Sequence, residues 1–157
     1  MRGAVGVLSQ TPTVSASPDY STGDCVGSLL TFQPVVMAAG HDATIQAVTV
    51  QCKVANTAAM DLILFNANPA ATVTASGLTD NTAPTIHVDD LAKVIGVINI
   101  TKWTSLGGGS QAIGEANNLA FPVELATTSM YGVLVARGTV NLASTSDITV
   151  TLRAFRH

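Results

Sequence analysis

The clearest pattern in the chain is an alternation of apolar and polar residues from Val48 to Val54. A period of two is typical of a β-strand that buries one face. After a break at Asn56 and Thr57, residues 60–65 form a nearly continuous apolar run, which indicates a strand buried on both faces. We expect these two strands to form the central hairpin of a β-sheet core.

Shorter apolar stretches between turn-forming residues predict the other strands. They are expected at residues 11–16, 25–32, 94–101, 119–125, 130–136 and 148–154. Pro122 favours a sheet edge for its strand, because proline donates no hydrogen bond to a neighbour. Residues 70–84 are expected to form a long exposed loop, and residues 111–118 irregular chain. One helical turn is predicted at residues 88–93. The acidic residues at its start and the lysine at its end interact favourably with the helix dipole.

This pattern predicts an all-β fold, an antiparallel β-sandwich of about seven to nine short strands with one short helical turn. Trp103 follows both Cys25 and Cys52, which does not match the Cys–Trp–Cys order of immunoglobulin domains. The uneven connections favour a jelly-roll-like arrangement. We expect an N-terminal arm at residues 1–10, ordered only against a neighbour or a sheet edge, and a single β-sandwich domain at residues 11–157.

The composition indicates a surface with few charged side chains. Only 11% of the 157 residues are charged, whereas soluble domains usually have roughly 25%. Thr, Ser, Asn and Gly replace the missing charges. Such a surface suits a protein that is covered by copies of itself or by a partner. The alternative is a compact secreted domain with a hydroxyl-rich surface.

Charge and hydropathy also argue against two classes of partner. A formal net charge of −3 provides no basic surface, so nucleic-acid binding is not expected. No apolar run approaches the roughly 18 residues of a membrane span, so we expect no membrane partner and synthesis in the cytoplasm. Thiols stay reduced there, and Cys25 and Cys52 are expected to be small buried hydrophobic residues rather than a disulfide.

Candidate catalytic and metal-binding residues are few. An imidazole beside two carboxylates at His87, Asp89 and Asp90 provides the ligand types of a divalent-metal site, but we favour the interpretation that the acids cap a helical turn. Three loop acids could also bind calcium, although their spacing does not match a calcium-binding loop. These acids are Asp19, Asp24 and Asp80.

Asp61 is unusual because it stands in the apolar run 60–65. A buried carboxylate there would need a partner such as a backbone amide or a lysine, and we expect Asp61 instead at the strand start, where it takes part in the turn. No nucleophile–base arrangement or phosphate-binding loop is present in the sequence. We therefore predict no enzyme, no cofactor, and no catalytic or metal-binding residue.

The remaining candidates are contact residues. Trp103 stands beside a Gly-rich segment, and tryptophan is enriched at interface hot spots, although a plain core position is the alternative. The arm, the 70–84 loop and the segment from Trp103 to Ser110 are the expected contacts. The contact residues predicted from these segments are Met1, Arg2, Val5, Val7, Leu8, Val73, Leu78, Trp103 and Leu106.

Four sequence blocks together carry a family resemblance. They are SPDYSTGD at 17–24, LILFNANP at 62–69, YG with LVARG at 131–138, and STSD at 144–147. Across residues 14–152, and least between 70 and 118, the chain resembles a family of small β-rich proteins of tailed bacteriophages that are encoded near the capsid genes. The resemblance implies a structural role in the virion, as a head decoration (cement) protein on the capsid surface.

The expected partners are then the major capsid protein and the protein itself, as a homotrimer at three-fold positions of the shell. Two alternatives stay open. One is another virion part, such as a neck, tail or head-fibre component. The other is a carbohydrate-binding or adhesin module, against which the scarcity of aromatic residues counts.

Overall fold

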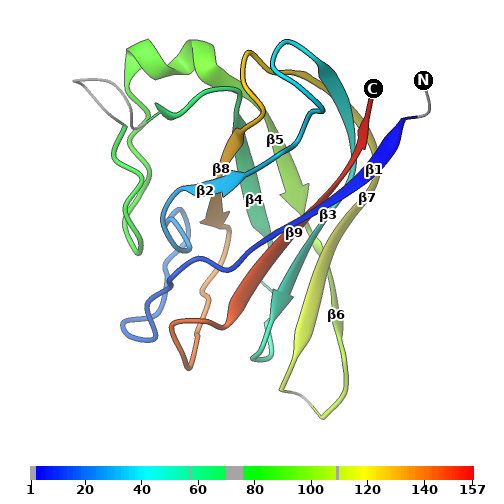
Figure 1. Cartoon of the computed structure of the whole chain (residues 1–157). Coiled ribbons are helices and arrows are strands. Elements are labelled where there is room, and N and C mark those ends of the chain that lie inside the picture. The colour runs from blue at the N-terminus through cyan, green and yellow to red at the C-terminus, as the bar shows by residue number, and fades with distance from the viewer. Residues whose placement is uncertain (1–2, 57, 70–75, 109) are drawn as a thin grey trace.

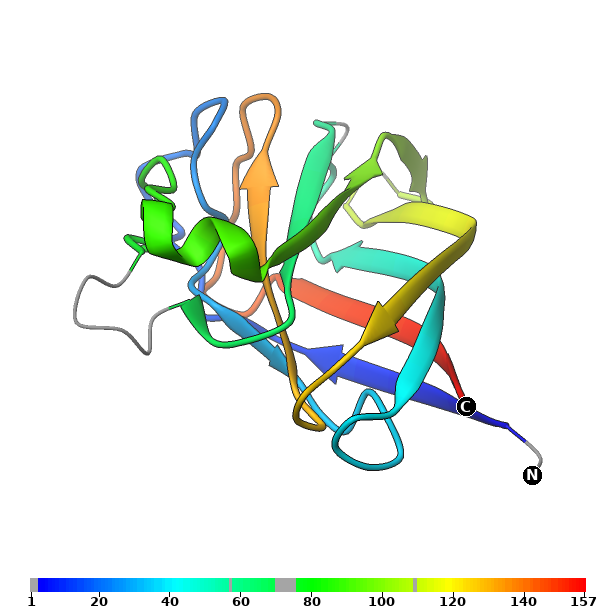
Figure 2. The same ribbon diagram turned by 90° about the horizontal axis from the view of Figure 1, so that it is seen from above.

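Two antiparallel β-sheets pack against each other in the computed structural model, which describes residues 3–56, 58–69, 76–108 and 110–157 (Figures 1 and 2). The predicted all-β sandwich is confirmed. Buried residues from both sheets form the main core, among them Val48 and Val50 of one sheet and Leu62 and Leu134 of the other. Gln51, which alternates with the two valines, is exposed, as the sequence pattern predicts.

The larger sheet has five strands in the order β1-β9-β3-β7-β6. They are β1 (Ala4–Gln10), β3 (Asp42–Cys52), β6 (Lys102–Ser105), β7 (Ala112–Glu124) and β9 (Ile148–Arg156). The smaller sheet has four strands in the order β2-β8-β4-β5. They are β2 (Leu30–Phe32), β4 (Met60–Phe65), β5 (Val94–Ile100) and β8 (Met130–Ala136). The predicted helical turn is confirmed as a 3₁₀-helix, η2 (Val88–Lys93), which leads into β5.

Every residue of β4 is buried, which confirms the prediction of a strand covered on both faces. Leu64 on its inner face packs in the main core. Phe65 on its outer face packs in a second apolar cluster that includes Cys25 and Leu78. The loops that carry Cys25 and Leu78 therefore cover part of the outer face of the four-stranded sheet.

The predicted central hairpin is wrong, because β3 and β4 belong to different sheets. β3 pairs with β7 and β9, whereas β4 pairs with β5 and β8. The alternation in residues 48–54 defines the buried face of a strand and contains no information about its neighbours. The chain crosses from one sheet to the other between Cys52 and Met60.

Residues 4–10 form β1, which pairs with β9 of the same molecule over its whole length, and a sheet edge was one of the two places where the arm was expected to become ordered. Residues 111–118 differ from the prediction. Residues 112–118, expected to be irregular, belong to β7; residues 112–117 pair with β3, and residues 112–115 also pair with β6. Pro122 lies in the part of β7 that has only β3 beside it, which is the local edge that proline favours.

Two other predicted strands are absent or shorter than expected. Residues 11–16, all of them described, contain no strand, and Val14 N donates a single hydrogen bond of 3.1 Å to Thr145 O. Pro12 has no N–H group with which to extend a ladder. In the predicted strand 25–32, only Leu30–Phe32 pairs with β8, while Cys25 forms an isolated bridge with Val135.

Strand pairs are nested along the chain. β1 pairs with β9, β2 with β8, β3 with β7, and β4 with β5, and the four pairs alternate between the larger and the smaller sheet. β6 is an additional strand beside β7. As a result, the start of β1 and the end of β9 lie side by side (Figure 1).

Candidate interaction surface

The contact residues predicted from the sequence do not form one patch. Val5 and Val7 of β1 are 69% and 60% exposed, and Leu106 after β6 is 57% exposed. However, β1 and β6 are opposite edges of the five-stranded sheet. Leu8 packs partly against the main core, and Leu78 is buried, so its side chain offers no surface to a partner. The predicted contacts Met1, Arg2 and Val73 lie outside the described residues.

Trp103 packs against the main core, which was the alternative to a contact role. Its ring lies over Gly114 of β7, where a β-carbon would come within 2.8 Å of the ring atoms. Glycine at position 114 therefore makes room for the indole. The indole is only partly covered, and its buried Nε1 has no hydrogen-bond partner among the described residues.

Val5 and Val7 lie on the outer face of the larger sheet. In the register of β1 and β9, Val5 is opposite Phe155 and Val7 is opposite Arg153. The phenyl ring of Phe155 makes an edge contact with His157, with 5.3 Å between ring centroids. A short apolar strip thus runs along the free edge of the sheet, beside β9.

Hydroxyl groups continue this outer face toward the other end of β1. Ser9 Oγ and Thr151 Oγ1 are 2.8 Å apart, and Thr11 Oγ1 and Thr149 Oγ1 are 3.0 Å apart. In each pair, the two hydroxyl groups form a hydrogen bond across the strands and add no charge to the surface. Apart from the exposed Arg153, this face therefore combines apolar and hydroxyl groups, which a partner desolvates at a lower cost than charges.

Four exposed apolar residues were missed by the sequence analysis. They are Met37, Val88, Leu91 and Val97, each between 47% and 69% exposed. Val88 and Leu91 are three residues apart on η2, and side chains at that spacing lie above one another on a 3₁₀-helix. Their spacing in the sequence was therefore a usable signal, whereas the exposure of Val97 depends on its place in the edge strand β5.

Several acidic side chains are buried, which is unusual for carboxylates. Three of the ten acids in the chain, Asp61, Asp90 and Asp147, are buried. Asp61 lies near the start of β4 as predicted, but it is not a turn residue: its carboxylate accepts from Arg137 Nε over 2.6 Å and from Asn99 Nδ2 over 2.7 Å. A buried carboxylate requires a charged or hydrogen-bonding partner, and for Asp61 this partner is Arg137, the residue after β8.

His87, Asp89 and Asp90 do not converge on one point. His87 Nδ1 accepts the backbone N–H of Asp89 and so caps η2. Asp90 is fully buried and accepts from Lys93 Nζ over 2.6 Å and from Ser76 Oγ over 2.7 Å. The lysine, and then the serine, hold the pKa of the Asp90 carboxyl below its ordinary value. Within the described ranges, no group of three His, Cys, Asp or Glu side chains could hold a metal ion.

Asp80 joins its own loop to three residues of the segment 15–27, which lies more than 50 residues earlier in the sequence. Its Oδ1 accepts from Tyr20 Oη over 2.7 Å and from Gly27 N over 2.6 Å, and its Oδ2 accepts from Ser15 Oγ over 2.6 Å. Ser15 N in turn donates to Tyr20 Oη over 2.6 Å. Asp80 therefore has its own partners, and the three loop acids considered for calcium serve separate hydrogen bonds.

This network predicts a pH dependence of stability. Burial, and then the hydrogen bond to Asp80, raises the pKa of Tyr20 well above the ordinary 10.0. Folding therefore favours the neutral phenol, and its contribution is constant below about pH 10 and is lost as the pH rises further. Urea denaturation between about pH 9 and pH 11 should show a steeper loss of stability in the wild type than in Tyr20→Phe. Equal slopes would contradict this assignment.

Both cysteines are free and buried, as predicted. Cys25 belongs to the second apolar cluster and Cys52 to the main core. Burial, followed by the charges of Asp24 and Asp80, raises the pKa of the Cys25 thiol to about 11, and burial also raises the pKa of Cys52. Neither thiol is therefore activated as a nucleophile.

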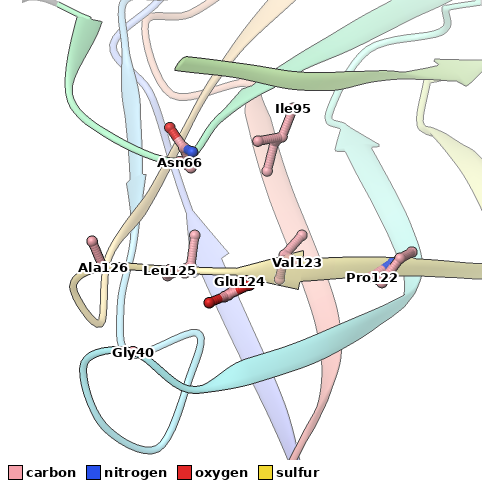
Figure 3. Close-up of a pocket in the computed structure, with 8 residues that line it drawn as sticks. All are labelled: Gly40, Asn66, Ile95, Pro122, Val123, Glu124, Leu125 and Ala126. Carbon is pink, nitrogen blue, oxygen red and sulfur yellow. The ribbon is translucent and has the colours of Figure 1, made fainter. Parts of the chain in front are cut away.

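A pocket of about 560 Å³ lies where β7 ends and β5 begins (Figure 3). Ile95 and Val123 point toward one another across it. The residues that line it are Gly40, Asn66, Ile95, Pro122, Val123, Glu124, Leu125 and Ala126. This lining offers one carboxylate and one carboxamide, a set suited to hydrogen bonding rather than to nucleophilic attack.

The chain matches no protein-family model and no curated protein. None of the helices in the described part of the chain is both long and apolar enough to cross a membrane. Function must therefore be argued from the surface and from the resemblance noted in the sequence.

The blocks that carry this resemblance lie close together in the fold. β4 pairs with β8, and Tyr20 forms a bridge with Val140 just beyond β8. Asp24 O also accepts the backbone N–H of Ala136 over 2.9 Å. Three of the four blocks, at 17–24, 62–69 and 131–138, therefore build one connected part of the scaffold.

Proposed function

We propose that this protein is a head decoration (cement) protein of a tailed bacteriophage, which binds the major capsid protein on the outside of the shell and stabilises it. One observation carries the proposal: a surface poor in charge that also displays apolar side chains. The exposed large apolar residues are Val5, Val7, Met37, Val88, Leu91, Val97 and Leu106. They are spread over both sheets and η2, as expected of a protein with several neighbours.

The inward placement of acids supports the same proposal. With Asp61, Asp90 and Asp147 buried, the outer surface carries even less charge than the composition implies. Desolvating a neutral surface costs less than desolvating a charged one, so modest contacts can hold many copies on a symmetric shell. The proposed contacts with the capsid protein involve binding and no chemical step.

We also propose that the sandwich is a jelly roll. The nested pairing, with pairs that alternate between two sheets, supports this classification, and β6 is then an insertion between two of its eight strands. Jelly rolls occur in viral capsid and lectin domains. The fold class is thus compatible with the proposed role, and function still depends on the surface.

The test is binding to heads assembled from the major capsid protein of the same phage genome. Purified protein is expected to co-sediment with these heads at a copy number that scales with the number of capsid subunits. A count of about six or twelve copies per particle would instead place the protein at the neck or tail. No co-sedimentation with either unexpanded or expanded heads would refute the proposal.

A matched pair of variants locates the contact. Leu106, next to the β6–β7 hairpin that projects from the sandwich in Figure 1, is 57% exposed, and Leu91 of η2 is 56% exposed. Leu106→Asp is expected to weaken head binding at least about tenfold, whereas Leu91→Asp, outside the contact segment predicted from Trp103 to Ser110, is expected to weaken it less. Equal effects of the two substitutions would mean that the hairpin is not the contact.

A further inference from the structure

The free edge of β1 differs from the other sheet edges. A strand at the edge of a sheet presents unpaired N–H and C=O groups, and proteins usually protect such edges with charges, prolines, bulges or short strands. β1 has seven residues, AVGVLSQ, without a charge or a proline. Its register with β9 is unbroken from Ala4 to Gln10, without a bulge.

The other edges among the described residues carry such protection. β2 has three residues and is followed closely by Pro34. β6 has four residues, the first of them Lys102. The part of β7 beyond β6 contains Pro122 and residues with positive φ angles, 58° at Asn118 and 44° at Ala120.

β5 is also less open than β1. Its register with β4 shifts between Leu64 and Phe65. After Ile100 the chain passes through Thr101 into β6 of the other sheet, which closes this side of the sandwich. Phe121 of β7 lies so close to Gly96 of β5 that a β-carbon at that glycine would come within 2.6 Å of the ring.

We infer that β1 is a dimerisation edge, which pairs antiparallel with β1 of a second copy and joins the two five-stranded sheets into one. The second copy is the occupant because it supplies an equally long, uncharged and unprotected edge. Two identical edges pair only around a two-fold axis, so the contact builds a closed dimer. This inference does not rest on the proposed function, and it replaces the three-fold self-association expected from the resemblance.

One register satisfies the side chains of both copies. If Gly6 lies opposite Gly6 of the partner subunit, Val5 of each copy lies opposite Val7 of the other on the outer face. Cross-strand pairs of β-branched residues are favourable, and the four valines cover one another. The pairing opposes no like charges, because β1 has none.

Two cations lie near the proposed contact. Arg156 is the nearer one: its guanidinium packs against Gly6 and donates to Pro34 O, a contact within its own copy. Arg153, opposite Val7 on β9, is exposed and one strand away from the new contact. The two Arg153 side chains would be separated by three strand spacings of about 4.8 Å each, which exceeds the Debye length of about 8 Å at physiological salt, so the repulsion between them is screened.

The experiment compares Val5→Lys with Val88→Lys by light scattering on a sizing column over a range of loading concentrations. Both valines are 69% exposed, so both variants are expected to fold, and only Val5 is on β1. Wild type and Val88→Lys are expected to have twice the 16.0 kDa mass of the chain. Val5→Lys is expected to raise the dimer dissociation constant at least about tenfold, since a lysine on an edge strand opposes pairing.

Hydrogen exchange identifies the edge that pairs. In the wild type, backbone amides of β1 are expected to exchange more slowly as the protein concentration rises, and in Val5→Lys this dependence is expected to disappear. The inference is overturned by a wild type that stays monomeric at about 1 mM. It is also overturned by a mass of three chains, by equal dissociation constants for the two variants, or by a dimer whose β1 amides gain no protection.

Discussion

Replacing Asp80 with alanine is expected to lower the free energy of unfolding by about 3–4 kcal/mol. The carboxylate accepts hydrogen bonds from Tyr20, Gly27 and Ser15, and hydrogen bonds to a charged group contribute about 1.5–3 kcal/mol each. The total is lower than the sum because Ser15 is only partly buried and can turn to water. Urea denaturation at neutral pH measures the change.

Asp19→Ala is the matched control for this substitution. Asp19 is also a loop acid, but it is exposed, whereas Asp80 is half-buried, and its carboxylate accepts one long hydrogen bond, 3.2 Å, from Asn141. We expect its removal to change the stability by less than about 0.5 kcal/mol. If Asp80→Ala were equally mild, the network around Tyr20 would not hold the loops to the sandwich.

Phe65→Ala is expected to destabilise the protein by a similar amount, about 3–5 kcal/mol. The ring is completely buried in the second apolar cluster, where it contacts the side chains that hold the covering loops against the four-stranded sheet. Its removal leaves a cavity that the β-sheet is too rigid to fill completely. Val97→Ala, on an exposed residue of the same sheet, is the control, with an expected change below about 0.5 kcal/mol.

The two cysteines report where Phe65→Ala acts. Cys25 lies in the same cluster as Phe65, and Cys52 lies in the main core. Labelling with a thiol reagent under native conditions is expected to become faster at Cys25, because the cavity admits water and brings its pKa down from about 11. The rate at Cys52 is expected to stay that of the wild type. Equal acceleration at both thiols would indicate general unfolding instead.

Local sequence patterns predicted strands well where burial dominates. The run at 60–65 matched a strand, and residues 48–52 of the alternation at 48–54 belong to β3, although Thr49 on the polar face is buried. Burial on one or two faces leaves a direct trace in the sequence. The partners of these strands were not predictable, since β3 and β4 are neighbours in sequence and belong to different sheets. Residues 112–118 were missed because pairing with both β3 and β6 compensates for Gly114, and because pairing with β3 includes Asn117.

The polar networks were harder to predict than the strands. Asp80 and Tyr20 are 60 residues apart, and nothing in either local sequence connects them. The pairing of Asp61 with Arg137 likewise spans 76 residues. A buried carboxylate in an apolar strand does predict that some partner exists, but only the tertiary structure identifies it. For the surface, the low charge content was visible in the composition, whereas the exposed edge of β1 required the sheet order.

The nested order of the strands also constrains how the chain folds. Asp61 of β4 and Asn99 of β5 meet across 38 residues, but Ser9 of β1 and Thr151 of β9 meet across 142. Closing the longer loop costs about 1 kcal/mol more in chain entropy, so the inner pairs are expected to form first and the outermost pair last. Among the described strands, β1 is synthesised first and its partner β9 last, so β1 leaves the ribosome long before it can pair. Throughout that interval Val5 and Val7 have no sheet to join, and we expect dilution or a chaperone to keep these segments of neighbouring nascent chains apart.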